Sequence, residues 1–167
     1  MDRRNALLTL ATAGAGLAIL PKQSLAQAKT PKEMIVGVWS LESIYDLGAD
    51  GKKYYVWGDG VQGLVVYTAG GTFSSQVIAA NRDKGASKNP RQPVGQAIGY
   101  FGTYVVDDAT MTVAIKIARC TFPGWDGVER VSKIAMLTDN EYRSEVAVVH
   151  DPVNGEVVPH TVYKRIG

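Results

Sequence analysis

The pattern of hydrophobic and polar positions along the chain changes near residue 34. Beyond it, short runs rich in Val, Ile, Thr and Tyr follow one another, and none keeps the 3.6-residue period of an amphipathic helix for long. Runs of this kind, bounded by turn residues, are typical of β-strands. The pattern predicts strands over residues 34–46, 52–57, 61–68, 72–79, 99–107, 110–119, 128–137, 141–149 and 156–165.

Most breaks between these runs contain residues that tolerate a positive φ. They are Asp50-Gly51, Gly70-Gly71, Asp107-Asp108, Asp139-Asn140 and Asn154-Gly155. Successive hairpins form an up-and-down meander, and a long meander removes its two unpaired edges by closing into a barrel. The chain is therefore predicted to be all-β, an antiparallel barrel of about 8–10 strands. A two-sheet sandwich is the alternative.

The first 28 residues have a different character. A charged start at Asp2-Arg3-Arg4 precedes the uncharged apolar run 6–20, and Ala26-Gln27-Ala28 supplies small residues at the spacing of a signal-peptidase site. An apolar run of about 15 residues is short for a spanning helix, which needs roughly 20, although an N-terminal membrane anchor is the alternative. The paired arginines resemble a twin-arginine export signal. We predict an export signal over 1–28, one domain over 29–167, and a periplasmic or secreted location.

Charge and cysteine content narrow the classes of partner. The chain has 18 Lys+Arg and 16 Asp+Glu; without Arg3, Arg4, Lys22 and Asp2, which lie in the predicted signal, 15 of each remain. A neutral domain gives no electrostatic reason to expect nucleic acid or an anionic membrane surface as a partner. The single cysteine, Cys120, excludes an intrachain disulfide, so stability must come from the core.

One connection, residues 80–98, is too long for a hairpin. It is polar, contains two prolines, and places four basic side chains against the single acidic Asp83. Long loops in compact domains are often binding loops, so this one could draw an acidic ligand to a basic rim. A solvated loop without such a role is the alternative. The basic residues are Arg82, Lys84, Lys88 and Arg91.

Several segments, taken in order, carry a likeness to a known family. They are Gly37-Val38-Trp39-Ser40-Leu41-Glu42-Ser43, Gly63–Thr68, Gly71–Gln76, Tyr100–Asp107, Phe122-Pro123-Gly124-Trp125 and Tyr163-Lys164-Arg165. Together they resemble the bacterial and fungal lipocalin-like domain family, in which Gly-x-Trp opens the first strand. The resemblance implies a lipocalin-type barrel with an internal cavity. It implies no single activity, because similar barrels serve as carriers and as cofactor-free isomerases, cyclases and lyases.

The sequence departs from the family in two places. Where family members frequently show histidine, this chain reads Val113-Ala114-Ile115-Lys116-Ile117. Chemistry that depends on that imidazole is therefore not carried over. The long connection is also poor in the aromatic and acidic residues that the family would lead us to expect.

The turn at Asp107-Asp108-Ala109-Thr110 indicates which side chains face the cavity. A two-residue loop at Asp108-Ala109 would pair Tyr104 with Val113 and place the bulkier, more apolar face inward. On that face Tyr100 and Tyr104 are candidate proton donors, or core tyrosines with internal partners. Parallel reasoning on the other strands completes the predicted ligand-binding set. It consists of Tyr45, Val66, Phe73, Tyr100, Tyr104, Val113, Ile115, Ile117 and Arg119.

Metal and cofactor chemistry finds little support in the sequence. A two-residue loop at Asn154-Gly155 would place His150 and His160, the only histidines, on opposite faces, which disfavours a histidine-based zinc or haem site. The sequence contains no Gly-rich phosphate loop, nucleophile elbow or Cys-x-x-Cys. We therefore expect neither a metal nor a cofactor.

Three functions remain open at this point. The first is an exported barrel that binds a small hydrophobic or aromatic molecule, an acidic one if the basic loop takes part. The second is a cofactor-free isomerase, cyclase or lyase that acts on such a molecule by acid–base chemistry. The third is a cell-envelope interaction protein with a filled core. A cavity and the polar groups that line it would distinguish the first two from the third.

The export signal gives the first testable prediction. N-terminal sequencing of the protein from a fractionated native host should begin at or near Lys29, because cleavage is expected after Ala28. An intact N-terminus on protein held in the cytoplasm would contradict it.

Overall fold

The computed structural model describes residues 28–83, 85, 89 and 95–167, so the predicted signal lies outside the described residues except for Ala28. Among the described residues, no helix has the length and apolar character needed to cross a membrane. The elements are the helix α1 (Pro31–Ile35), the strands β1 (Gly37–Gly48), β2 (Lys53–Tyr54), β3 (Gln62–Tyr67), β4 (Thr72–Ile78), β5 (Ala97–Asp107) and β6 (Thr112–Cys120), the 3-10 turn η1 (Pro123–Trp125), and the strands β7 (Glu129–Leu137), β8 (Glu141–Val146), β9 (Val149–Asp151) and β10 (Gly155–Arg165).

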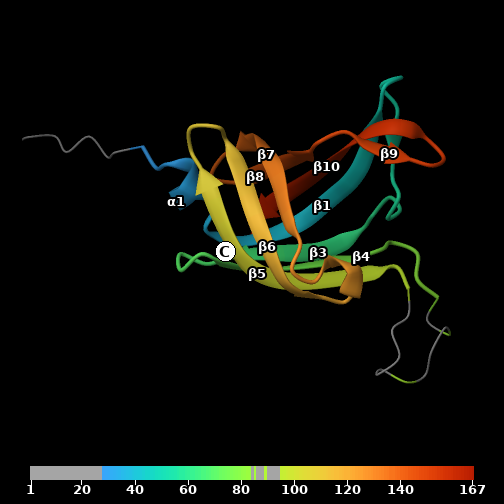
Figure 1. The fold of residues 1–167 in the computed structure, drawn as a ribbon, viewed down its shortest axis with the longest axis horizontal. Helices are drawn as coiled ribbons and strands as arrows, with labels where there is room; N and C mark the ends of the chain where they lie inside the picture. Colours follow the sequence, from blue (N-terminus) through green and yellow to red (C-terminus); the bar gives the residue numbers. More distant parts are fainter. Residues whose placement is uncertain (1–27, 84, 86–88, 90–94) are drawn as a thin grey trace, which may run out of the picture.

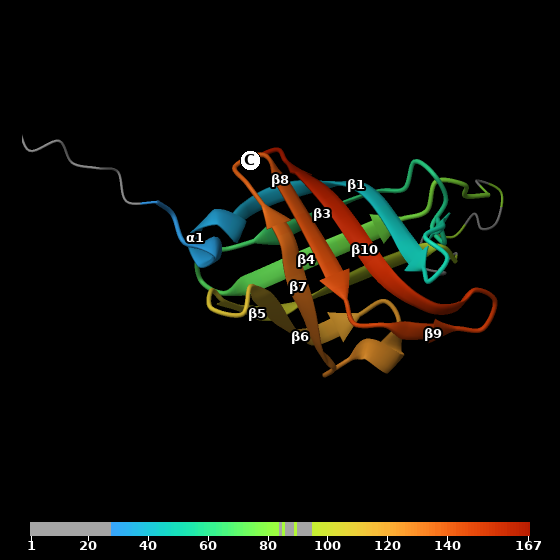
Figure 2. The same ribbon diagram turned by 90° about the horizontal axis from the view of Figure 1, so that it is seen from above.

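Eight of the strands close into an antiparallel barrel (Figure 1). Neighbours follow the order β1, β3, β4, β5, β6, β7, β8, β10, and pairing of β10 with β1 completes the circle. Figure 2 shows β10 between β8 and β1. The short strands β2 and β9 extend the outer ends of β1 and β10. The predicted all-β antiparallel barrel is confirmed, and the sandwich alternative is wrong.

The segment before the first barrel strand is helical rather than extended. Thr30 Oγ1 accepts a hydrogen bond from the Glu33 amide at 3.3 Å, and the Glu33 carboxylate accepts one from the Thr30 amide at 2.9 Å. This reciprocal capping box, with Pro31 at the first helical position, starts α1. The strand predicted from residue 34 therefore begins only at Gly37. The Thr-x-x-Glu pattern of a capping box is present in the sequence and would have indicated this helix.

One end of the barrel is closed around Trp39, which is fully buried. Its Nε1 donates to the Ile35 carbonyl at 2.7 Å, and the Arg165 guanidinium lies 4.0 Å from its ring centroid. Arg165 also donates to the carbonyls of Val36, Met34 and Asp139. Trp39 thus plugs this end of the barrel, and the guanidinium of the last strand over its ring adds a cation–π contact.

Gly37 leaves the room that Arg165 needs at this closed end. Its φ is 141°, and a Cβ there would collide with the guanidinium and with the carbonyl of Gly167. The glycine of the Gly-x-Trp segment is therefore explained by the side chain that covers the tryptophan.

The inward face predicted for the β5–β6 hairpin is correct, although its loop is longer than expected. Asp107 pairs with Thr112 and Tyr104 with Ile115, because residues 108–111 form the turn and Met111 takes a φ of 52°. A change of register by two residues keeps every side chain on its face. Tyr104, Val113 and Ile117 are accordingly buried.

The face assigned to Val66 is wrong. The β3–β4 turn has Gly71 at a φ of 80° and pairs Tyr67 with Phe73 and Val65 with Ser75. A two-residue turn at Gly70-Gly71 would have paired Val66 with Ser75 instead. Because the register differs by one residue, Val65 and Tyr67 point inward and Val66 points outward.

The face assigned to Tyr45 is also wrong, because β1 contains a β-bulge. The register against β10 shifts between Leu41 and Ser43. A bulge adds one residue to one strand and inverts the alternation beyond it. Asp46 therefore faces the interior, while Tyr45 lies outside and stacks on His160 with ring centroids 5.0 Å apart.

A second bulge, in the β5–β6 pair, determines on which face of the barrel Arg119 lies. The β5–β6 register shifts between Phe101 and Gly102, so Arg119 pairs with the exposed Phe101 and Cys120 pairs with Tyr100. Arg119 consequently points outward, 3.7 Å from Asp126. Of the two positions open to this side chain, the barrel mouth and the solvent-facing side, Arg119 takes the second and does not line the cavity.

The C-terminal hairpin differs from the prediction in two respects. The strand predicted over residues 141–149 is divided into β8 and β9. The β9–β10 turn pairs His150 with Glu156 and Val149 with the buried Val157, and β10 stays regular as far as His160. His150 and His160 therefore share the outer face rather than opposite faces, four strand positions apart. The described residues hold no group of three or more His, Cys, Asp and Glu side chains able to bind a metal ion.

The closed end gives a second testable prediction. Arg165→Met keeps most of the aliphatic stem but leaves three carbonyls without their charged donor, so it should lower the free energy of unfolding by about 2–4 kcal/mol. Lys164→Met removes only an exposed ion pair to Glu42 (3.2 Å) and should cost less than about 1 kcal/mol. Urea unfolding measures both. A larger loss for the Lys164 variant would contradict the role given to Arg165.

Candidate ligand-binding site

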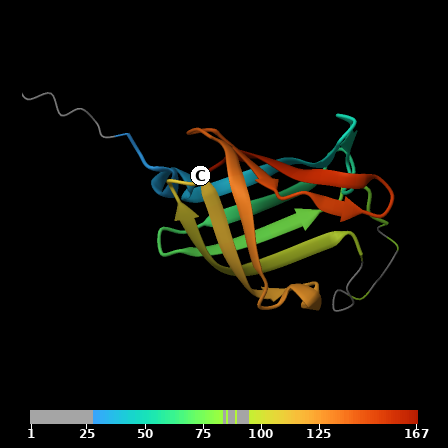
Figure 3. The same ribbon diagram turned by 45° about the horizontal axis from the view of Figure 1, so that its top comes forward.

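A cavity of about 200 Å³ lies inside the barrel, toward the end opposite α1. The β1–β10 register runs from the Trp39–Arg165 pair at the closed end to the Gly48–Val157 pair at the other, and the cavity lining includes Asp46 and Pro159 near that second end. Figure 3 shows β9, the last residues of β4 and the first residues of β5 at this open end. The lining comprises Ile44, Asp46, Val56, Trp57, Tyr67, Val77, Ile98, Tyr100, Ile115, Trp125, Arg130, Val131, Ser132, Tyr142, Ser144, Val146, Pro159, Thr161 and Tyr163.

The cavity floor is formed by the tyrosines Tyr67, Tyr142 and Tyr163, all of them buried. Burial holds the pKa of Tyr67 and Tyr163 well above the ordinary value for tyrosine, and burial also raises the pKa of Tyr142. Hydrogen bonds link the Tyr142 side chain to those of Ser144, Tyr67 and Ser132. The floor therefore presents neutral hydroxyl groups that can donate and accept hydrogen bonds.

An aromatic chain connects this floor to the open end. Tyr67 lies 6.3 Å from Phe73, Phe73 lies 5.8 Å from Tyr100, and Tyr100 lies 5.7 Å from Trp125, measured between ring centroids. The last two contacts are edge-to-face, the arrangement that aromatic pairs prefer. Tyr67, Tyr100 and Trp125 line the cavity, and Phe73 supports them from the packed core behind it.

Two tryptophans lie at the cavity mouth, each contributed by a segment without strand structure. Trp57 precedes the turn at Gly58, and its carbonyl accepts a hydrogen bond from the Ala80 amide at 3.0 Å. Trp125 belongs to η1, and the Arg130 guanidinium lies 4.2 Å from its ring centroid. Arg130 thereby brings a positive charge to the lining.

Asp46 is the acidic side chain of the lining and is 9% exposed. Burial raises its pKa, the negative charge of Asp151 raises it further, and His160 opposes both. Within the described part of the chain, its carboxylate has no hydrogen bond or ion pair. Its oxygens are accessible from the cavity rather than sealed off, so water or an occupant can pair with them.

The structure divides the predicted ligand-binding residues into three sets. Tyr100 and Ile115 line the cavity. Phe73, Tyr104, Val113 and Ile117 are buried in the packed core beside it. Tyr45, Val66 and Arg119 lie on the outer face of the barrel. Ligand contacts by any of these residues stay predictions.

The two candidate proton donors have different surroundings. The Tyr104 hydroxyl donates to the Thr68 carbonyl at 2.8 Å, and burial raises its pKa. Tyr104 thus has the internal partner that a core tyrosine needs. The Tyr100 hydroxyl has no hydrogen bond among the described residues and faces the cavity close to the floor tyrosines. Of the two, only Tyr100 can meet an occupant.

Sequence reasoning missed Asp46, Arg130 and the floor tyrosines. Asp46 was missed because no local pattern reveals the bulge in β1. Tyr142 and Tyr163 face each other across paired strands, with ring centroids 5.4 Å apart. A signal was present for Tyr142, which lies between Glu141 and Arg143 in a predicted strand. Only the closing of the barrel, however, brings the tyrosines to one place.

The basic loop can be followed only in part. Arg82 is exposed, whereas Lys84, Lys88 and Arg91 lie outside the described residues. The predicted basic rim therefore stays a prediction.

The fold and cavity define the class of protein: a closed eight-stranded antiparallel barrel with an internal cavity. The sequence profile of the lipocalin-like domain family matches residues 36–166, so the chain belongs to that family. The resemblance inferred from the sequence is confirmed. A search of curated proteins finds no match.

Solved structures with a similar course of the chain were also found. One is a lipocalin-like protein from Bacteroides uniformis (16% identity, TM-score 0.45, covering 79% of this chain and 98% of that one). A redesigned β-barrel has 13% identity and a TM-score of 0.42, covering 81% of this chain and 95% of that one. Bovine odorant-binding protein, in complex with a selenium-containing odorant, has 12% identity and a TM-score of 0.43, covering 84% of this chain and 76% of that one.

Proposed function

We propose that the protein binds a small, largely apolar aromatic molecule with at least one polar group inside its barrel. The observation that carries the proposal is the internal cavity, in which apolar and aromatic walls meet a floor of hydroxyl groups. Pockets for small molecules typically combine mostly apolar walls with a few convergent polar groups. A barrel whose core was filled, as the interaction-protein hypothesis requires, would leave no such space.

The size of the cavity limits the ligand. About 200 Å³ is below the roughly 300–1,000 Å³ typical of pockets for drug-sized molecules. A compound with one ring or two fused rings is the appropriate scale. Burial of its apolar surface supplies roughly 25 cal/mol per Å², and the hydroxyl groups select its orientation.

We further propose that the protein works in the periplasm or outside the cell. The support is the sequence pattern of residues 1–28, with its charged start, apolar run and small residues. A barrel in that compartment would carry, store or sequester its ligand.

Filling the cavity tests the binding proposal. Ile115→Trp adds an indole on the cavity side of β6, whereas Ala114→Trp adds the same group at the neighbouring, outward-facing position. With 2-naphthol as a fluorescent probe, the wild type should show saturable one-site binding. Ile115→Trp should weaken it at least about tenfold, because the probe and the indole need the same space. Ala114→Trp should bind like the wild type.

Thermal unfolding must show that both tryptophan variants are folded. Equal binding by the wild type and a folded Ile115→Trp variant would place the site elsewhere.

A cofactor-free isomerase, cyclase or lyase is a second candidate. Tyr100 favours it, because its hydroxyl faces the cavity without an internal hydrogen bond among the described residues, and Asp46 adds a carboxyl whose raised pKa suits proton transfer. In this reaction one residue would donate a proton to the bound molecule and another would accept one.

Phe replacement of Tyr100 separates the two functions. An enzyme should lose turnover by about 10²–10⁴ in Tyr100→Phe while affinity changes little. A binding protein should convert no candidate ligand and lose only severalfold in affinity, as expected for one neutral hydrogen bond of roughly 0.5–1.5 kcal/mol. Tyr104→Phe is the control, because it removes a hydroxyl that bonds to Thr68 and should lower stability without affecting the ligand. Full turnover in Tyr100→Phe would exclude Tyr100 as the proton donor.

A further inference from the structure

We propose that the cavity selects an aromatic amine, with the ammonium group bound by Asp46 and the ring held among the aromatic side chains of the mouth. The inference rests on the proposed ligand-binding function and specifies its ligand class. It follows from where the charges of the barrel lie and which of them have partners.

The first step is the position of Asp46. The bulge between Leu41 and Ser43 turns the later part of β1 so that Ile44 and Asp46 line the cavity. The residues opposite and beside Asp46 are Pro159 on β10 and Tyr54 on β2. Neither is a cation, so the strands that hold the carboxylate provide no counter-charge directly across from it.

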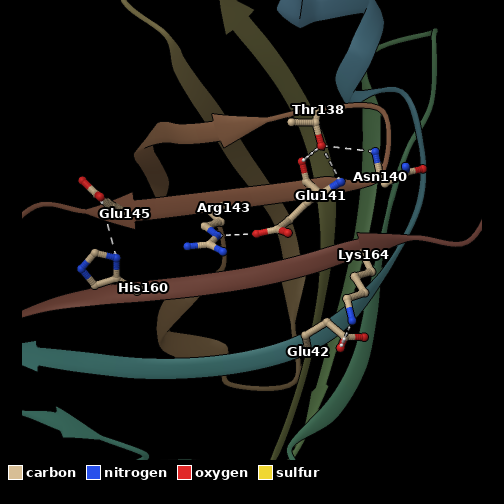
Figure 4. Close-up of polar contacts among 8 residues, drawn as sticks. All are labelled: Glu42, Thr138, Asn140, Glu141, Arg143, Glu145, His160 and Lys164. Carbon is tan, nitrogen blue, oxygen red and sulfur yellow. Dashed lines mark hydrogen bonds and ion pairs between the residues drawn. The ribbon is translucent and has the colours of Figure 1, made fainter.

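The second step is the contrast with the outer face. On the outside of β8, β10 and β1, charged side chains pair with one another (Figure 4). Lys164 Nζ lies 3.2 Å from Glu42, His160 Nδ1 lies 3.8 Å from Glu145, and Arg143 contacts Glu141. Asp46 is more buried than these groups and yet has no ion pair within the described residues.

The third step concerns the cations that could have served Asp46 from within the protein. Lys53, on β2, lies 4.3 Å from the ring centroid of Tyr45, on the outer face. His160 is also outside, stacked on Tyr45. Arg130 lies over the Trp125 ring on another wall of the cavity. None of these cations forms an ion pair with Asp46 among the described residues, and only His160 acts on it, at longer range. A direct counter-charge for Asp46 is therefore left for the occupant to supply.

The fourth step is the balance of charge and aromatic surface. Asp151 adds negative potential at Asp46, which favours a cation and disfavours a second carboxylate. Trp57 and Tyr100 line the same cavity, and aromatic rings attract positive charge, so they suit a cation attached to an aromatic ring. A charged hydrogen bond in this partly dry site would offset the burial of the carboxylate.

Three probes of similar size test the inference: 2-phenylethylamine, 2-phenylethanol and phenylacetate. Calorimetric titration of the wild type at pH 8 should show the amine binding at least about tenfold more tightly than the alcohol, with phenylacetate weakest. Asp46→Asn should weaken the amine by about 10- to 100-fold and leave the alcohol within about twofold. Glu145→Gln, which removes a carboxylate from the outer face, should change neither.

The pH dependence provides an independent readout. Because the pKa of Asp46 is raised above its ordinary value of 3.8, amine affinity should begin to fall at a higher pH than for an exposed aspartate. The affinity is lost as pH decreases through the raised pKa, since the protonated carboxyl no longer attracts the ammonium. Asp46→Asn should lack this dependence. The other titratable groups on the surrounding elements are Lys53 and Tyr54 on β2, Asp151 on β9, His160 on β10, Tyr100 on β5 and Arg130 on β7.

The outcomes separate the two proposals. If 2-naphthol binds and Ile115→Trp abolishes that binding, but the amine has no advantage over the alcohol, the cavity function stands and the charge assignment is wrong. Tightest binding of phenylacetate, with its loss in Arg130→Gln, would likewise overturn the amine assignment. If neither 2-naphthol nor the three probes bind, the proposed function itself fails.

Discussion

The structure depends on the pairing of β1 with β10. This pair runs from Trp39 opposite Arg165 to Gly48 opposite Val157 and converts a meander with two free edges into a closed barrel. Closure gives each of the eight barrel strands two neighbours and forces alternate side chains into one enclosed volume. The cavity and the contact of Arg165 with Trp39 follow from it, because residues of β8 and β10 would not meet those of β1 and β3 in an open sheet.

Within that barrel, irregularities of single residues decide the chemistry. The bulge in β1 turns Asp46 inward and Tyr45 outward, and the bulge opposite Phe101 exchanges Arg119 for Cys120 on the inner face. Strand pairing continues on both sides of each bulge, so the architecture is unchanged while the charges of the interior change. Compared with a barrel of regular strands, the interior has the carboxylate of Asp46 near its open end and lacks the guanidinium of Arg119.

The same irregularities mark the limit of prediction from the sequence. Alternation and turn residues were sufficient for the all-β barrel and for the inward faces of Tyr104, Val113 and Ile117. The inward and outward faces of β5 and β6 were predicted correctly although the loop length was wrong, because the predicted register differed from the observed one by two residues. The error in the β3–β4 turn was one residue, and Val66 was placed on the wrong side. Local sequence specifies strand and turn propensity well, but whether a turn or bulge holds one more residue depends on packing against distant strands.

The separation of the closing strands along the chain also has a temporal consequence. Trp39 and Arg165 are 126 residues apart (165 minus 39), so the closing contact forms only after nearly the whole chain is available. Contacts between distant segments are expensive in loop entropy and slow the folding of β-rich proteins. Until β10 docks, the growing chain exposes two sheet edges and the apolar wall of its future cavity. A nascent chain that stops before β10 is therefore expected to be prone to aggregation. Docking of the eleven-residue strand β10 covers both edges and removes that risk.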